Sequence, residues 1–370
     1  MKCLYATMAN SLHHILSSRQ FKKADVLRYI CNARRMRTAV TAEAAADVME
    51  PSKPISRFQG KTVVNMFYEP STRTNCSFQA AAHKLGCNVI SLTESASSVK
   101  KGESLEDTIR TLGCYAEAIV LRHPERGAAY RASVVSRIPI INAGDGNGEH
   151  PTQALLDIYT IYEELAAFGL NLDSPIAEIT VAFVGDLKNS RTVHSLVHLL
   201  GLFANIRFIF LSPESLVIPR ELVDVQLAKG HQVFINTMSI DEALLMCDVL
   251  YMTRIQKERF ASESEYDAVM ANRRDYSIDG ERMERAKQQM IVMHPLPRLD
   301  EIAEEVDKDP RAAYFRQVEN GLYMRMAILE QLFDTHSRIY VDNPMHSTNN
   351  TSASAFASAS ASASVYTTNN

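Results

Sequence analysis

The sequence predicts an α/β protein with two doubly wound domains, each a mainly parallel sheet flanked by helices, and a ligand site in the cleft between them. Short runs of β-branched or aromatic residues alternate with amphipathic stretches of ten or more residues, a pattern typical of βαβ units. The 370 residues suffice for two or three domains. The apolar runs are also numerous enough to favour two doubly wound domains over one.

The expected strands are the apolar runs, which cover residues 62–67, 118–121, 138–141, 179–184, 207–211, 249–252 and 291–293. A helix is expected from Pro151 toward Ala167, because proline is favoured at the first helical position and apolar residues follow with helical spacing. The loop from Gly169 to Pro175 then separates the first strand series from the second.

These elements divide the chain into a first domain at 1–152 and a second at 153–319. An amphipathic stretch at about 320–337 is expected to complete the first domain, although its apolar spacing alone leaves this open. Residues 341–370 are expected to be a disordered Ser/Ala-rich tail, because Thr348 to Asn370 carry no charge and bury too little apolar surface to offset their ordering entropy. The alternative is an adventitious strand, since the Ser/Ala alternation has a period of 2.

The composition excludes several classes of function. Lys and Arg number 39 against 43 Asp and Glu, a net charge of −4 that lacks the basic footprint of nucleic-acid binding. No apolar run approaches the roughly 18 to 20 residues of a membrane span. The six cysteines form no CxxC pair and no compact His/Cys cluster, so neither a disulfide framework nor a metal site is expected.

We therefore expect a cytoplasmic protein with reduced thiols and with neither nucleic-acid nor membrane partners. The first 24 residues carry no acid but lack the Arg-rich bias and the long apolar segment of targeting peptides. A mature start is therefore preferred over a targeting segment.

Polar and often basic residues follow the expected strands. Ligands of open parallel sheets bind beyond the carboxyl ends of the strands, so these residues are the candidates for a site. They are the segments 69–75, 122–124, 142–153, 185–194, 253–259 and 294–298. Arg73, Arg122, Arg191 and Arg254 would surround one crevice in a chain of negative total charge, which indicates a small polyanionic ligand.

Each segment also has a simpler interpretation when it is taken alone. Ser71 to Arg73 is equally consistent with an ordinary helix N-cap and a surface arginine, Gly144 to Gly148 with a plain turn, and His294 with a capped core histidine. No G-x-x-x-x-G-K-[ST] motif is present, and no G-x-G-x-x-G follows Val184. These absences disfavour a P-loop hydrolase and a nicotinamide-dependent oxidoreductase.

Six motifs in order resemble the transcarbamoylase family. They are Ser71-Thr72-Arg73-Thr74, Leu121-Arg122-His123-Pro124, His150-Pro151-Thr152-Gln153, Gly185-Asp186-Leu187 with Arg191-Thr192-Val193-His194-Ser195, Met252-Thr253-Arg254, and His294-Pro295-Leu296-Pro297. The resemblance covers about residues 14–336 and is to the members of the family that use aspartate. It implies that carbamoyl phosphate and L-aspartate give N-carbamoyl-L-aspartate and phosphate, in de novo pyrimidine (UMP) biosynthesis. It further implies a homotrimer with sites shared between subunits, and no cofactor or metal.

The resemblance also implies the site residues. Carbamoyl phosphate would be held by Ser71, Thr72, Arg73, Thr74, Arg122, His150, Gln153, Ser97, Pro295 and Leu296, and L-aspartate by Lys101, Arg191, Arg254, Gln256 and Leu296. Thr74, Arg122, His150 and Lys101 would be catalytic, the first three as donors to the carbonyl oxygen. Gln153 would hold the carbamoyl nitrogen, and the backbone carbonyls of Pro295 and Leu296 would orient the amine.

The segment from Ser95 to Glu103 resembles the family's mobile loop, which reaches into the site of a neighbouring subunit. Counting back from the lysine before Gly102 assigns Lys101 and Ser97, with Ser98 as the alternative serine. Taken without the resemblance, a Ser-rich loop with two lysines is an ordinary surface turn.

Glu69, Glu258 and Arg259 would form interdomain ion pairs when the domains close over both substrates, again by resemblance to the family. The alternative is exposed surface charge, which contributes about 0 to 1 kcal/mol per pair.

Two other functions within the family stay open. An ornithine-specific enzyme is disfavoured, because a pocket for cationic ornithine should not need two arginines and because its pattern has a cysteine where this chain has Pro295. A non-catalytic member that binds carbamoyl phosphate is disfavoured, because no strand-end residue of the pattern is missing. The sequence leaves the presence of a separate regulatory chain open.

Overall fold

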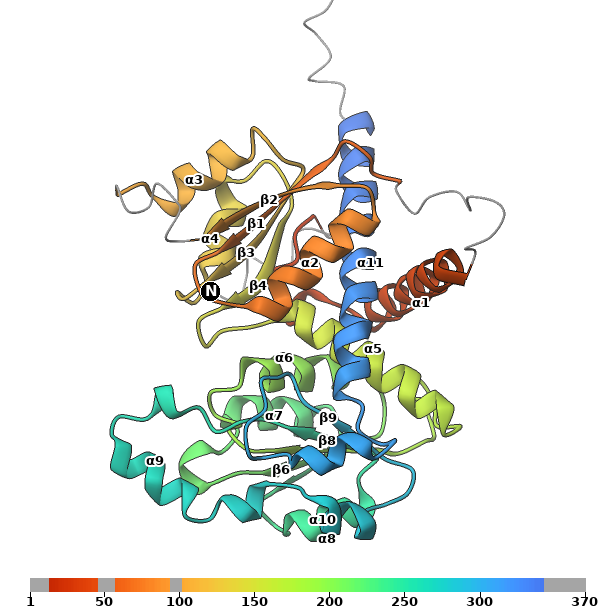
Figure 1. Ribbon diagram of the computed structural model, residues 1–370, viewed down its shortest axis with the longest axis vertical. Helices are drawn as coiled ribbons and strands as arrows, with labels where there is room; N and C mark the ends of the chain where they lie inside the picture. Colours follow the sequence, from red (N-terminus) through yellow and green to blue (C-terminus); the bar gives the residue numbers. More distant parts are fainter. Residues whose placement is uncertain (1–12, 46–56, 94–101, 343–370) are drawn as a thin grey trace, which may run out of the picture.

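The structure is a computed structural model and describes residues 13–45, 57–93 and 102–342. Figure 1 shows two domains stacked along the long axis of the molecule, each built on a parallel sheet. The tail predicted at 341–370 lies outside the described residues, apart from the first two positions, which end the last helix. Ser97 and Lys101 also lie outside them.

The first sheet contains β1 (Thr62–Phe67), β2 (Asn88–Thr93), β3 (Ala118–His123) and β4 (Ile140–Asp145), all parallel, in the order β2-β1-β3-β4. Helices α3 (Leu105–Leu112) and α4 (Ala128–Val135) form one core with Val64 and Ile119. Helices α1 (Lys23–Ala45) and α2 (Thr72–Lys84) contribute to the core that holds Val63 and Val120. Successive strand residues thus enter opposite layers, as in sheets buried on both faces.

The second sheet contains β5 (Ile179–Val184), β6 (Ile206–Leu211), β7 (Gln232–Ile235), β8 (Val249–Met252) and β9 (Ile291–Met293) in the parallel order β7-β6-β5-β8-β9. Helices α6 (Arg191–Leu200) and α7 (Arg220–Ala228) share a core with Val181 and Phe183. Helices α8 (Ile240–Met246) and α10 (Gly280–Arg285) share the opposite core with Val184 and Leu250. Helix α9 (Glu263–Met270) has no buried residue and lies at the margin of the domain.

Two helices join the domains. Helix α5 (Pro151–Ala167) begins at the expected proline and packs against α6 and α11, and α11 (Tyr314–Asp342) packs against α1, α2 and α5. One core therefore continues through both domains, as Val63, Ile158 and Phe183 illustrate. The boundary predicted between residues 152 and 153 falls in the first turn of α5, and the stretch predicted at about 320–337 lies inside α11. No described helix combines the length and apolar character needed to cross a membrane.

The sequence prediction missed strands β2 and β7, both at sheet edges. Four of the six residues of β2 are exposed, and no residue of the four-residue β7 is buried. Edge strands that face solvent carry little apolar periodicity, which is the signal that the prediction uses.

The sheet order explains why the site lies between the domains. The chain reverses its direction of travel across the sheet between β1 and β3, and again between β5 and β8. In open α/β sheets such reversals open a crevice beyond the carboxyl ends of the strands. The loops after these four strands therefore converge on the junction between the domains.

Candidate active site

A cleft of about 610 Å³ opens between the carboxyl ends of the two sheets. Its described lining holds six arginines, which are Arg73, Arg122, Arg191, Arg254, Arg259 and Arg325, against the glutamates Glu69 and Glu258. Every site residue predicted from the sequence and described by the structure lines this cleft, namely Ser71, Thr72, Arg73, Thr74, Arg122, His150, Gln153, Arg191, Arg254, Gln256, Pro295 and Leu296. A chain with a net charge of −4 thus concentrates positive charge at one place, which favours an anionic ligand.

The N-terminus of α2 forms one part of the cleft. Ser71 is the N-cap of this helix, but its hydroxyl makes no capping hydrogen bond, so the N–H groups of the first turn are left for a ligand. Thr72, Arg73 and Thr74 line the cleft beside it. Burial lowers the pKa of the Arg73 guanidinium. The missing cap bond and the partly buried cation distinguish this segment from an ordinary N-cap and suit a phosphate group.

Glu69, in the loop after β1, lies between arginines of the two domains. Its Oε2 is 3.3 Å from Arg122 Nε and 3.6 Å from Arg191 Nη2, as ion pairs without hydrogen-bond alignment. Burial, with Arg191 and Arg73 nearby, lowers the pKa of Arg122 to about 10. In this structure Glu69 forms an interdomain ion pair with Arg191. Glu258, which was also expected in an interdomain pair, instead forms a pair with Arg254 of its own domain.

The glycine segment at the end of β4 and just after it holds Arg191 in place. The Arg191 guanidinium donates to the Gly146 carbonyl, and a Cβ on Gly144 would lie only 3.0 Å from Arg191 Cζ. Gly146 has φ +52°, and a Cβ there would lie 2.4 Å from the Pro124 carbonyl oxygen. The simpler interpretation of Gly144 to Gly148 as a turn is right only from Gly146 onward, because Gly144 and Asp145 are the last residues of β4. The glycines also allow Arg191 to approach the backbone.

His150 is the N-cap of α5 and is 3% exposed. Its backbone N–H donates to Ser195 Oγ at 3.1 Å, which joins the start of α5 to α6 in the second domain. Burial, together with Arg191, Arg122 and Arg325, lowers the pKa of His150 well below its ordinary value. The imidazole is therefore neutral at neutral pH and can present one N–H donor.

The loop after β8 carries Arg254 and Gln256, and the loop after β5 carries Asp186. Arg254 forms a bidentate pair with Glu258, and Gln256 Nε2 lies 3.4 Å from Asp186 Oδ2. These loops approach closely because Gly185, with φ +115°, has no Cβ, and one would lie 2.1 Å from the Thr253 carbonyl oxygen.

His294 shapes the loop that carries Pro295 and Leu296. His294 is 1% exposed, and its Nδ1 accepts from the Leu296 N–H at 2.8 Å. The proton is therefore on Nε2, which donates to Glu301 Oε1 at 2.7 Å. Leu296 has φ +56°, an uncommon value for a residue with a branched side chain. His294 is thus a satisfied core histidine whose bonds position the loop.

Sequence reasoning missed a buried network behind Gln153. Gln153 Nε2 donates to Asp157 Oδ1 at 2.8 Å, and the same carboxylate accepts from Tyr251 and Gln317. It also missed Arg325, which lines the cleft from α11 and is 3% exposed. The sequence does carry one indication of both residues, since Asp157 and Arg325 are charged positions within apolar helical stretches. A buried charge is costly unless it is compensated, so such a position indicates a specific partner or ligand.

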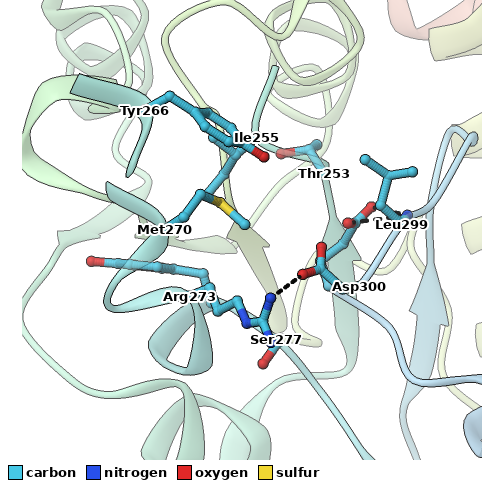
Figure 2. A pocket seen from close by; sticks show the side chains of 10 residues that line it. Thr253, Ile255, Tyr266, Met270, Arg273, Ser277, Leu299 and Asp300 are labelled. Atoms are coloured by element: carbon cyan, nitrogen blue, oxygen red, sulfur yellow. Dashed lines mark hydrogen bonds and ion pairs between the residues drawn. The ribbon is translucent and has the colours of Figure 1, made fainter. Parts of the chain in front are cut away.

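A second hollow lies beside the cleft and shares Thr253 with it. Its volume is about 20 Å³, room for a single water, and Arg273 and Asp300 form a 2.9 Å ion pair at its wall (Figure 2). It is too small for a substrate. Within residues 13–45, 57–93 and 102–342, no group of three or more His, Cys, Asp and Glu side chains is arranged to hold a metal ion.

Comparisons with known proteins cover most of the described chain. Residues 13–163 match the family model for the aspartate/ornithine carbamoyltransferase carbamoyl-P binding domain, and residues 177–332 match the Asp/Orn binding domain. The chain is 45% identical over 324 residues to the aspartate carbamoyltransferase catalytic subunit of Methanocaldococcus jannaschii, a match that covers 87% of this chain and 98% of the relative. A Trypanosoma cruzi aspartate transcarbamoylase, solved with carbamoyl phosphate and aspartate, is 42% identical with a TM-score of 0.76, covering 86% of this chain and 94% of that one.

The chain also resembles part of much longer proteins. It is 49% identical over 318 residues to the multifunctional protein CAD of Squalus acanthias, a match that covers 85% of this chain. The match covers only 13% of that relative, and two further multifunctional relatives are covered to 16% and 13%. The chain thus spans a small part of the multifunctional relatives and nearly all of the catalytic subunit.

Proposed function

Because the chain belongs to the aspartate/ornithine carbamoyltransferase family, we propose that it transfers the carbamoyl group of carbamoyl phosphate to the amine of L-aspartate. The products are N-carbamoyl-L-aspartate and phosphate, and the reaction is an early step of de novo pyrimidine biosynthesis. The observation that carries this proposal is the convergence of arginines from both domains on one cleft. Carbamoyl phosphate has about two negative charges and aspartate has two carboxylates, so binding both requires several fixed cations.

Carbamoyl phosphate binds in the first domain. The free N–H groups at the start of α2, with Arg73 and the hydroxyls of Ser71 and Thr72, hold the phosphate. Gln153 holds the carbamoyl nitrogen. Binding in one orientation places the carbonyl carbon toward the second domain, and this positioning removes a large part of the entropic barrier.

Thr74, Arg122 and His150 act on the carbonyl oxygen. Attack by the amine moves negative charge onto this oxygen, where each preorganised donor is typically worth about 3 kcal/mol. Neutral His150 donates an N–H without adding charge to a cleft that is already cationic. The C–N bond forms while the C–O bond to phosphate breaks, and a proton passes from the amine to the departing phosphate. No electron transfer takes place, so this chemistry needs no redox cofactor.

L-Aspartate binds through Arg191, Arg254 and Gln256, while the carbonyls of Pro295 and Leu296 orient its amine. Contacts with Glu69 and Gly146 hold Arg191 at the junction of the domains. Two arginines favour an acceptor with a second carboxylate over ornithine, whose side-chain ammonium would meet like charge.

A direct test mixes the purified protein with carbamoyl phosphate and either L-aspartate or L-ornithine and measures the ureido product. We expect turnover with aspartate alone. Turnover with ornithine alone would reassign the acceptor. No turnover with either amine would overturn the enzymatic proposal in favour of a binding protein of the same family.

Lys101 and Ser97 complete the proposed site from a neighbouring subunit of a cytoplasmic homotrimer. A mixture of Arg73→Ala and Lys101→Ala proteins tests this, because a hybrid trimer contains one site in which both residues are intact. We expect the mixture to regain part of the wild-type rate. A mixture no more active than its components would show that each subunit holds a complete site.

A further inference from the structure

Asp157 is fully buried on α5, one helical turn after Gln153. Its Oδ1 accepts from Gln153 Nε2 at 2.8 Å and from Gln317 Nε2 at 2.6 Å, and its Oδ2 accepts from the Tyr251 hydroxyl at 2.7 Å. Gln317 belongs to α11 and Tyr251 to β8. One carboxylate therefore connects the helix that carries Gln153, the helix that joins the domains, and the second sheet.

Which atom of each glutamine amide faces Asp157 follows from whether its hydrogen-bond partners can donate or accept. The backbone N–H of His294 can only donate, and it lies 3.0 Å from Gln317 Oε1, so Gln317 presents its nitrogen to Asp157. An ionised carboxylate can only accept, so Gln153 also presents its nitrogen to Asp157. The oxygen of Gln153 is thus on the side of the amide away from Asp157, and Gln153 lines the cleft.

We propose that Asp157 is a positioning residue that holds the Gln153 amide with its oxygen toward the cleft, where this oxygen accepts from the carbamoyl nitrogen. The inference rests on the proposed carbamoyl transfer and deepens it. A reversed amide would place an NH₂ group against the NH₂ group of the substrate, so two donors would face each other. Through Gln317 the same carboxylate also holds the backbone at His294, where the loop that orients the amine begins.

The charge of Asp157 determines whether it can hold both amides. In the described part of the chain, the titratable or charged groups that face it are Tyr251 from β8 and Arg325 from α11, whereas its amide partners are neutral. Burial raises the pKa of Asp157 to about 7, and the three hydrogen bonds and Arg325 limit the rise. A proton on the carboxyl removes acceptor capacity and lets the Gln153 amide turn. We therefore expect kcat/KM for carbamoyl phosphate to fall as the pH drops below about 7.

Three variants test the proposal against the wild-type enzyme from about pH 5.5 to about 9. Asp157→Leu removes the acceptor, and kcat/KM for carbamoyl phosphate should fall about tenfold, as for one charge-assisted hydrogen bond. Asp157→Asn keeps one oxygen for the two amides and does not titrate, so it should retain more activity and lose the decline below about pH 7. Tyr251→Phe removes only the third hydrogen bond to the same carboxylate, so the decline should move to higher pH.

Two controls separate positioning from a general loss of structure. Inhibition by inorganic phosphate depends on the start of α2 and not on Gln153, so its inhibition constant should change less than about twofold in all three variants. In a Gln153→Ala background, Asp157→Asn should cause no further loss in kcat/KM for carbamoyl phosphate, because the route through Gln153 is already removed. The route through Gln317 concerns the loop that orients the amine, so any loss that remains should appear in the KM for aspartate.

An unchanged acid decline and an unchanged kcat/KM in Asp157→Asn and Asp157→Leu would overturn the proposal. Equal weakening of phosphate and carbamoyl phosphate would overturn it in favour of a structural role. If Asp157→Leu does not fold, the Asn variant and the double variant carry the test. Wild-type turnover is measured first, so failure of the proposed function is seen independently of Asp157.

Discussion

Glu69 and Arg191 belong to different domains and meet at the cleft, with Glu69 Oε2 3.6 Å from Arg191 Nη2. The same oxygen lies 3.3 Å from Arg122 Nε. The side chains of both arginines are 15% exposed and that of Glu69 is 25% exposed, so solvent screens this group less than a surface pair. One carboxylate therefore offsets two cations that are proposed to serve different substrates.

Glu69→Gln should raise the KM for aspartate and lower kcat, with about a tenfold loss in kcat/KM. The substitution leaves Arg122 and Arg191 to repel each other and removes a link between the domains. Steady-state kinetics with both substrates varied checks this. Glu106→Gln is a matched control, because Glu106 pairs with Arg131 inside the first domain at the surface. Identical kinetics for the two variants would contradict a role for Glu69.

Arg73→Ala and Arg254→Ala should each weaken the binding of a different substrate. Arg73→Ala should weaken phosphate binding about tenfold to a hundredfold, the loss of charged hydrogen bonds, while Arg254→Ala should weaken aspartate by a similar factor. Calorimetric titration with phosphate and kinetic titration with aspartate measure the two effects. Similar losses of both ligands in both variants would show that the division between the domains is wrong.

Gly146→Ala should impair both stability and aspartate binding. A Cβ at this position would lie 2.4 Å from the Pro124 carbonyl oxygen, so the turn must move, and its carbonyl would no longer hold Arg191. Gly230→Ala is the control, since φ is +85° there but nothing lies within 4 Å of the new Cβ. The control should lose only about 1 to 2 kcal/mol by thermal unfolding and keep its aspartate KM. Equal effects would mean that the contact with Pro124 is unimportant.

His198→Gln should make unfolding less dependent on pH. Burial lowers the pKa of His198 from 6.5 to about 4, with Arg19 acting in the same direction. Between these values the unfolded chain binds a proton that the native state does not, so the wild-type free energy of unfolding decreases as the pH falls. The free energy of unfolding of His198→Gln, relative to that of the wild type, should therefore rise as the pH falls through this window and level off below about 4. Urea unfolding at several pH values measures it, and a difference that does not vary with pH would refute the prediction.

Features that depend on short-range patterns could be predicted from the amino-acid sequence. Apolar runs alternating with helical stretches identified the parallel strands from β1 to β9 except the solvated edge strands β2 and β7. Parallel strands place their carboxyl ends at one edge of a sheet, so Arg73, Arg122, Arg191 and Arg254 were expected around one crevice, and they line it.

The groups that meet inside that crevice from distant parts of the chain are set by the packing of the two domains. Asp157 and Gln317 are 160 positions apart, and Glu69 meets Arg191 only because α5 and α11 hold the domains against each other. No local period encodes such pairs, since each side chain taken alone is compatible with an exposed surface. Burial in a shared core removes the water around these groups, so each buried charge or amide depends on its particular protein partner. For this reason the Gln153 amide presents its nitrogen to Asp157 and turns its oxygen away from it.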